Sequence, residues 1–153
     1  MRKVVLESPY KGNIQDNINY AKACIRDCLS RGEAPIASHL LFTQDGILDD
    51  NKPEERILGI EAGHAWTDKA EAVVVYIDKG MSSGMRLGIE IAKKNGVSVE
   101  YRSLFIKDYR KESLLKLKKI LDHYSKQLSN EQYDDTAKAE EGLAIVEDLL
   151  RVG

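Results

Sequence analysis

Short apolar runs alternate with amphipathic stretches over the first hundred residues of the chain. The apolar runs predict four strands, at residues 4–6, 34–41, 72–77 and 97–101. The run at 72–77 is Ala-Val-Val-Val-Tyr-Ile and is apolar at every position. A central parallel strand that helices cover on both faces requires this pattern, so we expect these residues in the middle of a sheet.

The stretches between these runs have the spacing of helices. Apolar residues three or four positions apart predict a first helix before Gly32; they are Ile14, Ile18, Ala21, Ile25 and Cys28. Pro53 and the acidic residues after it predict the first turn of a second helix, which continues to Trp66. A third helix is expected to begin at Ser82 or Ser83 and to end before Gly96. Its buried face is expected to contain Met85, Gly88, Ile89 and Ala92.

Two amphipathic stripes follow residue 108, one from Leu114 to Leu128 and one from Ala139 to Leu150, and they predict two C-terminal helices. The alternation of strands and helices before them predicts an α/β fold. We expect a Rossmann-like or flavodoxin-like parallel sheet of four or five strands, flanked by helices. We expect this α/β domain at residues 1–107, with helices at 108–153 that pack on the same domain or on a partner subunit.

Composition narrows the classes of partner. The chain has 153 residues, 42% of them hydrophobic and 31% charged, and a formal net charge of -2. Without a basic excess, polymeric nucleic acid is not an expected partner. The longest apolar run is too short for a membrane helix, and Glu7 interrupts the N-terminus too early for a signal peptide, so we expect a cytoplasmic protein without a membrane partner. Cys24 and Cys28 lack a second pair for zinc and are expected as small buried side chains.

The residues that follow the predicted strands are the candidates for a ligand site, because parallel α/β sheets bind ligands at the carboxyl ends of their strands. After the first strand these are Ser8, Pro9, Tyr10 and Asn13. After the third strand, Ser82, Ser83, Gly84, Met85 and Arg86 open a helix, where backbone N–H groups and the helix dipole favour an anion. Arg86 would bind that anion, or would instead form a surface pair with Glu90.

His39 and Asp78 also lie at predicted strand ends. His39 would orient a base or hydroxyl of the ligand, or would satisfy a backbone carbonyl. Asp78 would be an acid or a hydroxyl acceptor whose pKa burial perturbs, or a turn-forming residue before Lys79. His64 and His123 fall within predicted helices without ligands at metal spacing, so we expect neither a metal nor a cofactor.

The sequence has neither of two common nucleotide-binding motifs. It has no G-x-x-x-x-G-K-[ST] loop, which is typical of ATPases, and no G-x-G-x-x-G after the first strand, which is typical of dinucleotide-dependent dehydrogenases. Residues 80–84 fit the G-x-S-x-G pattern of serine hydrolases. The one histidine downstream of them is His123, within a predicted helix, which disfavours an acyl-transfer enzyme.

Several segments resemble the nucleoside 2-deoxyribosyltransferase-like superfamily, which includes the deoxynucleoside monophosphate N-hydrolases. These segments are Pro-Ile-Ala-Ser-His-Leu-Leu at 35–41, Glu-Glu-Arg at 54–56, and the stretch 70–78 followed by Met-Ser-Ser-Gly-Met at 81–85. More closely, these segments resemble a branch of small proteins, many from phages and prophages, that are usually described only as deoxyribosyltransferase-like. The resemblance covers about the first hundred residues and leaves out the helices after Asp108.

The resemblance implies cleavage of an N-glycosidic bond by a Glu at the start of the third helix, in a context such as G-x-x-[YF]-E-[IL]-G. Here Arg86 stands at that position, and Glu90 lies one turn further along, about 6 Å down the helix axis. Either Glu90 serves as the nucleophile or electrostatic stabiliser, or the reaction is lost. The resemblance assigns Asp78 as proton donor or hydroxyl acceptor and the loop at Ser8, Pro9 and Tyr10 to the sugar or phosphate.

The sequence therefore predicts an N-glycosidic bond hydrolase or deoxyribosyltransferase-like enzyme that acts on a nucleoside or nucleotide. The alternative is a non-catalytic nucleotide-binding protein that senses or sequesters its ligand. Because the C-terminal helices exceed what a four-strand sheet needs for cover, we also expect a homo-oligomer.

Overall fold

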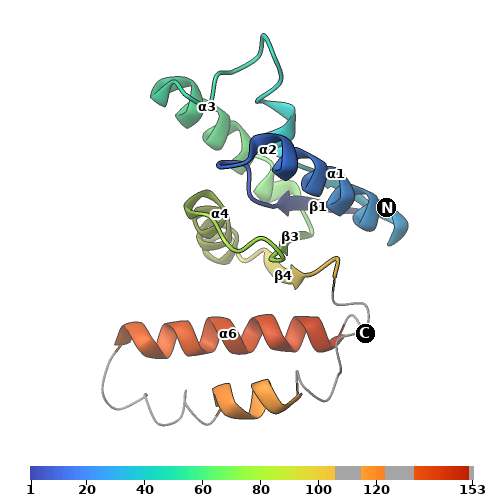
Figure 1. Cartoon of the computed structure of the whole chain (residues 1–153), viewed down its shortest axis with the longest axis vertical. Coiled ribbons are helices and arrows are strands. Elements are labelled where there is room, and N and C mark those ends of the chain that lie inside the picture. Colours follow the sequence, from blue (N-terminus) through green and yellow to red (C-terminus); the bar gives the residue numbers. More distant parts are fainter. Residues whose placement is uncertain (106–114, 123–132, 152–153) are drawn as a thin grey trace. The chain divides into compact units, whose positions relative to one another are not determined.

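The computed structural model describes residues 1–105, 115–122 and 133–151, with the side chains of 133–138 and 150–151 excepted. The chain divides into two compact units, Met1–Glu100 and Tyr101–Gly153. The expected domain boundary between residues 107 and 108 lies outside the described residues. Figure 1 labels most of the helices and strands along the chain.

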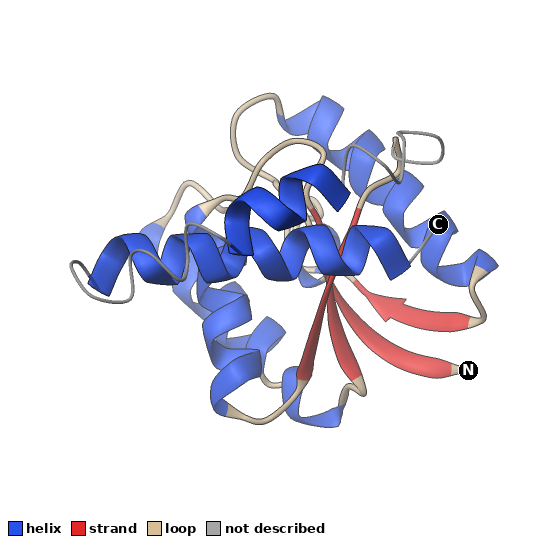
Figure 2. Ribbon diagram, turned by 90° about the horizontal axis from the view of Figure 1, so that it is seen from below, coloured by secondary structure: helices blue, strands red, loops and turns tan. Residues whose placement is uncertain are grey.

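Four strands form one parallel sheet, as the sequence predicted. They are β1 (Arg2–Glu7), β2 (Glu33–Ile36), β3 (Ala72–Tyr76) and β4 (Ser98–Arg102), and their order is β2-β1-β3-β4 (Figure 2). All five residues of β3 are buried, which confirms its central place. The strand order is flavodoxin-like, and it reverses direction between β1 and β3, so a crevice opens at their carboxyl ends.

Helices flank the sheet, and α4 buries the face that the spacing predicted. α1 (Ile14–Ser30) packs on β2, and α4 (Ser83–Lys94) packs on β3. Ser82 caps α4 by accepting a hydrogen bond from the backbone N–H of Met85 at 3.3 Å, which confirms where this helix begins. The buried residues of α4 are Met85, Gly88, Ile89 and Ala92, the set expected from the sequence.

α1 is rotated slightly from the expected face. Ala21 and Cys28 are buried as expected, but Ile14 is exposed, and Tyr20 and Cys24 complete the buried face. Both cysteines are fully buried, which confirms their interpretation as core side chains.

The expectation of a strand over residues 34–41 is wrong in its second half. β2 ends at Ile36, and Ser38–Leu41 form the short helix α2. The reason lies in the backbone, because the carbonyl of Ala37 accepts from the N–H groups of Leu40 and Leu41, which turns the chain out of the sheet. This turn brings α2 against α3 (Pro53–His64), the second predicted helix, which a short 3-10 turn at Thr67–Lys69 follows.

In the second unit, residues 115–122 are helical, and α6 spans Tyr133–Arg151. Leu121 lies beside Gly142, and Lys118 forms an ion pair with Glu147 at 2.8 Å, so the two helices run antiparallel. Ala139 and Val146 of the expected second stripe are buried. Parts of the first stripe, including Leu114, Tyr124 and Leu128, lie outside the described residues. Within the described ranges no helix is long and apolar enough to cross a membrane.

Candidate functional site

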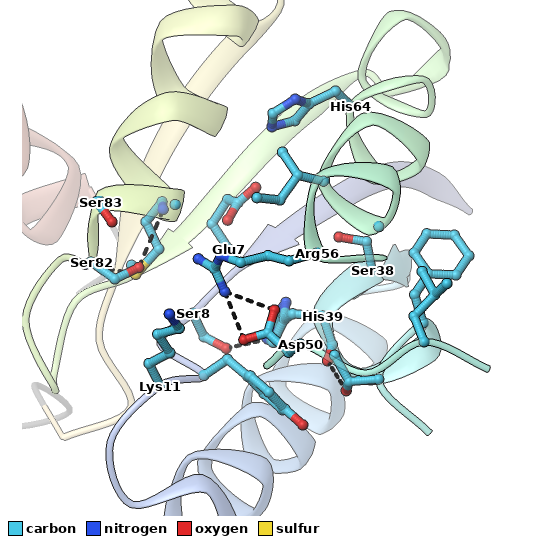
Figure 3. Close-up of a pocket in the computed structure, with 18 of the residues that line it drawn as sticks. Glu7, Ser8, Lys11, Ser38, His39, Asp50, Arg56, His64, Ser82 and Ser83 are labelled. Carbon is cyan, nitrogen blue, oxygen red and sulfur yellow. Dashed lines mark hydrogen bonds and ion pairs between the residues drawn. The ribbon is translucent and has the colours of Figure 1, made fainter. Parts of the chain in front are cut away.

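A cavity of about 210 Å³ opens in the first unit, at the carboxyl ends of the strands (Figure 3). Its walls come from the end of β1 and the loop after it, from α2, from α3 with the loop before it, and from the first turn of α4. A second, more open cavity of about 770 Å³ adjoins it. The two share Tyr10, Lys11, Thr43, Leu48, Asp50 and Glu55 as lining residues.

Glu7 ends β1 and presents its carboxyl to the cavity. In the described part of the chain, the Glu7 side chain has neither a hydrogen bond nor an ion pair. Surrounding protein atoms disfavour its charged form and raise the pKa of Glu7 to about 8. Its carboxyl is therefore mostly protonated at neutral pH and can donate a proton to a ligand.

Gly88 makes room for this carboxyl. A Cβ atom on Gly88 would lie 2.5 Å from Oε1 of Glu7, closer than real Cβ contacts, and 3.0 Å from its Cδ. Residue 88 lies inside α4, so the glycine is needed here for close approach of the Glu7 side chain.

His39 and Ser8 form a second polar group in the wall. The Oγ of Ser8 lies 2.8 Å from Nε2 of His39, and Ser8 is only 4% exposed. Burial lowers the pKa of His39 to about 4, so the ring is neutral at physiological pH. The hydroxyl of Thr43 donates to the backbone carbonyl of His39 at 2.6 Å, and the ring of Tyr10 meets the imidazole edge-on. These contacts fix the orientation of the imidazole.

A third polar group consists of Arg56 and Asp50. Nη1 of Arg56 lies 2.7 Å from Oδ1 and 2.6 Å from Oδ2 of Asp50. Arg56 extends from α3 into the cavity, and Asp50 comes from the loop before that helix (Figure 3). Lys11 adds a second cation to the lining.

The rest of the lining is largely apolar and includes Phe42, Leu48, Ile60 and Met85. His64, in the last turn of α3, also faces the cavity, and burial lowers its pKa. An apolar wall with a few converging polar groups is typical of sites for small organic ligands.

The cavity brings together a large part of the residues that the sequence singled out. Its lining includes Ser8, Tyr10, His39, Ser82, Ser83, Gly84 and Met85. These residues come from three different strand ends, as expected from the binding position of parallel sheets.

Five other candidates do not line the cavity. Pro9 is buried, and Asn13 caps α1 by accepting from the N–H of Asp16 at 3.3 Å. The side chain of Asp78 accepts a hydrogen bond from the hydroxyl of Tyr20 at 2.6 Å. Arg86 and Glu90 are exposed on α4, four residues apart on the face opposite to the buried one.

Sequence reasoning missed several polar residues of the cavity, among them Glu7, Lys11, Asp50 and Arg56. A signal for Glu7 existed, because it is a carboxylate at the end of an apolar strand, the same feature that drew attention to Asp78. Nothing in the local sequence pairs Asp50 with Arg56, because their contact depends on how the loop folds back onto α3.

In the part of the chain that the structure describes, no group of three or more His, Cys, Asp or Glu side chains is arranged to hold a metal ion. The polar groups of the cavity are suited to proton donation and to hydrogen bonding of an organic ligand.

A search of curated proteins found no match to this chain. Residues 2–102 match a family described as Domain of unknown function (DUF7768), and this range includes β1 to β4 and every residue that lines the two cavities. Because the match covers well over half of the 153 residues, the chain belongs to the DUF7768 family.

Proposed function

We propose that the cavity binds a nucleoside or nucleotide and that the protein hydrolyses its N-glycosidic bond or transfers its sugar. The observation that carries the proposal is the carboxyl of Glu7, which faces the cavity without a protein partner among the described residues and has a pKa raised to about 8. Perturbed carboxyls in clefts are typical of acid–base catalysts.

The shape and lining of the cavity support a ligand of this class. Phe42, Leu48 and Ile60 offer an apolar wall to a planar base, and the polar residues offer partners to sugar hydroxyls. The adjoining cavity gives room for the part of the ligand that about 210 Å³ does not hold. The position between β1 and β3 is where flavodoxin-like sheets bind their ligands.

In the proposed reaction, Glu7 acts as the general acid. The bond between C1′ of the sugar and the base nitrogen breaks, its electron pair stays on that base, and the base takes the proton of Glu7. The oxygen of water then bonds to C1′, and the proton that this water loses returns to the carboxylate of Glu7. In a transfer reaction, a nitrogen of a second base takes the place of water and gives up the proton instead.

Ser8 and His39 have a positioning role in this scheme. Because His39 is neutral and bonded to Ser8, it adds no positive charge that would lower the pKa of Glu7 and remove its proton before the ligand is bound. The pair gives the ligand a fixed polar surface beside the acid.

One observation favours the alternative, a nucleotide-binding protein without catalysis. N-glycosidic cleavage commonly uses two carboxyl groups, yet Asp50 is bound to Arg56, and Glu90 is exposed outside the cavity. Glu7 is then the sole lining carboxyl that lacks a protein partner within the described ranges.

Incubation with a panel of nucleosides and their monophosphates, followed by chromatography of the free base, tests the proposal. We expect base release by the wild type and a loss of about 100-fold or more in Glu7→Gln. Glu90→Gln is the matched control, because the same change outside the cavity should leave release intact. Base release that survives in Glu7→Gln and disappears in Glu90→Gln would reject the role of Glu7. No release by the wild type, with a thermal shift on adding nucleotide, would favour the binding protein.

A further inference from the structure

The guanidinium of Arg56 is only partly used by the protein. Both oxygens of Asp50 contact the same nitrogen, Nη1, at 2.7 and 2.6 Å. Within the described residues, Nε and Nη2 of Arg56 have no acceptor. Neither nitrogen is a buried atom without a partner, so both are accessible to solvent, and Arg56 is one of the residues that line the cavity.

The open nitrogens form one edge of a rigid donor fork. The Nε and Nη2 hydrogens of an arginine point in parallel and match two oxygens of a carboxylate or phosphate. Figure 3 shows the guanidinium held by Asp50 in the interior of the cavity. Fixing one nitrogen leaves the opposite edge preorganised for a ligand.

We infer that Arg56 is the oxyanion receptor of the cavity, binding a phosphate ester or carboxylate group of the ligand through Nε and Nη2, and that Asp50 is its positioning residue. This inference rests on the proposed function only in that the cavity takes a small-molecule ligand. It does not require cleavage of that ligand.

The surroundings of Arg56 complement an anion. Lys11 lines the same cavity, and its ammonium has no protein partner in the described part of the chain. The first turn of α4 adds backbone N–H groups and the hydroxyl of Ser83. Among the lining acids, Asp50 is bound to Arg56, and Glu55 accepts from Lys52 at 2.7 Å and from the N–H of Asp49. Glu7 is mostly uncharged at neutral pH.

Titration of the intact protein with inorganic phosphate and, separately, with acetate tests the inference by NMR of the arginine Nε–H signals. We expect the Arg56 signal to shift with at least one of the two anions, and the stronger binder identifies the preferred group. Arg56→Lys keeps the charge but loses the fork, so we expect at least tenfold weaker binding. Arg86→Gln is the control, because it removes an arginine outside the cavity and should leave the affinity unchanged.

Asp50→Asn tests the positioning role without removing the receptor. We expect weaker anion binding and a broader Arg56 Nε–H signal, with both partly restored in Asp50→Glu. Circular dichroism establishes that each variant is folded. Equal affinity in the wild type and Arg56→Lys, or a loss in Arg86→Gln alone, would overturn the inference, as would the absence of any Arg56 shift. Since base release is measured separately, anion binding that needs Arg56 stands even if no nucleoside is cleaved.

Discussion

The carboxyl of Glu7 occupies the space that a side chain at position 88 would need. A Cβ on Gly88 would approach Oε1 of Glu7 to 2.5 Å, so β1 and α4 fit together around a carboxyl rather than an apolar side chain. Burying a carboxyl is unfavourable, and the cavity beside it offers the place where a ligand can use it.

Gly88→Ala should therefore displace Glu7. The added methyl meets the far end of a flexible side chain, which can turn away, and alanine favours the helix over glycine by about 1 kcal/mol, so we expect only a small change in the free energy of unfolding. We also expect ligand binding or base release to fall, because the carboxyl leaves its position. NMR titration of the Glu7 carboxyl measures this displacement, since its pKa should fall from about 8 towards 4.5.

Gly84→Ala is the stability control for this change. A Cβ at Gly84 would have its nearest neighbour, Oγ of Ser82, at 3.9 Å, an ordinary contact. Since alanine favours a helix over glycine by about 1 kcal/mol, this variant should be as stable as the wild type or more so. A pKa of Glu7 that stays near 8 in Gly88→Ala, or that falls as far in Gly84→Ala, would contradict the proposed fit of Glu7 against Gly88.

The ionisation of Glu7 should make stability depend on pH. Its pKa is about 8 in the folded chain and 4.5 without the fold, so the folded protein retains a proton that the unfolded chain loses. The resulting stabilisation is fully present below pH 4.5 and is lost as pH rises through 8. Glu7→Gln removes this loss, and we expect a gain over the wild type on the order of 1–4 kcal/mol at alkaline pH, with little gain in acid. Melting temperatures of the wild type and of Glu7→Gln across pH measure this gain. Two curves that stay parallel at all pH values would refute the prediction.

His39 should stay neutral well into acid. Burial lowers its pKa to about 4 from 6.5, so its ring signals in NMR should titrate near the lower value while the protein is folded. The unfolded chain takes up this proton first, so the contribution of His39 to stability is present above pH 6.5 and is lost as pH falls towards 4. A titration midpoint near 6.5 would show that the ring is open to water and would contradict its place in the wall.

Asp78 and Tyr20 should matter for stability rather than for chemistry. The 2.6 Å hydrogen bond of Tyr20 holds Asp78 outside the cavity, and Lys79 lies over the Tyr20 ring. Tyr20→Phe should cost about 1–3 kcal/mol of stability, because it removes a donor from a carboxylate. If the protein releases base, the rate per folded molecule should be unchanged; a large fall in that rate would return Asp78 to the candidate catalytic residues.

Local sequence predicted the elements of the first unit well, because each depends on periodicity and on caps within a few residues. Ser82 caps α4, and the buried face of that helix was fixed by the spacing of Met85, Gly88, Ile89 and Ala92. The same spacing places Arg86 and Glu90 on the opposite face of the helix. For the position of these two residues, the spacing was a better guide than the resemblance that put Arg86 at a catalytic position and Glu90 one turn beyond it. The short helix after Ala37 was not predicted, because an apolar run of eight residues fits one long strand as well as a short strand followed by a helical turn.

The sequence by itself determined that strands alternate with helices and that Ser8, His39 and Ser82 follow strand ends. Only the tertiary structure decided that Glu7 meets Gly88 and that Asp50 holds Arg56 in the same cavity. These contacts depend on strand order and on the packing of α3 and α4, and such long-range geometry arises when the whole core is buried, not from any short stretch of residues.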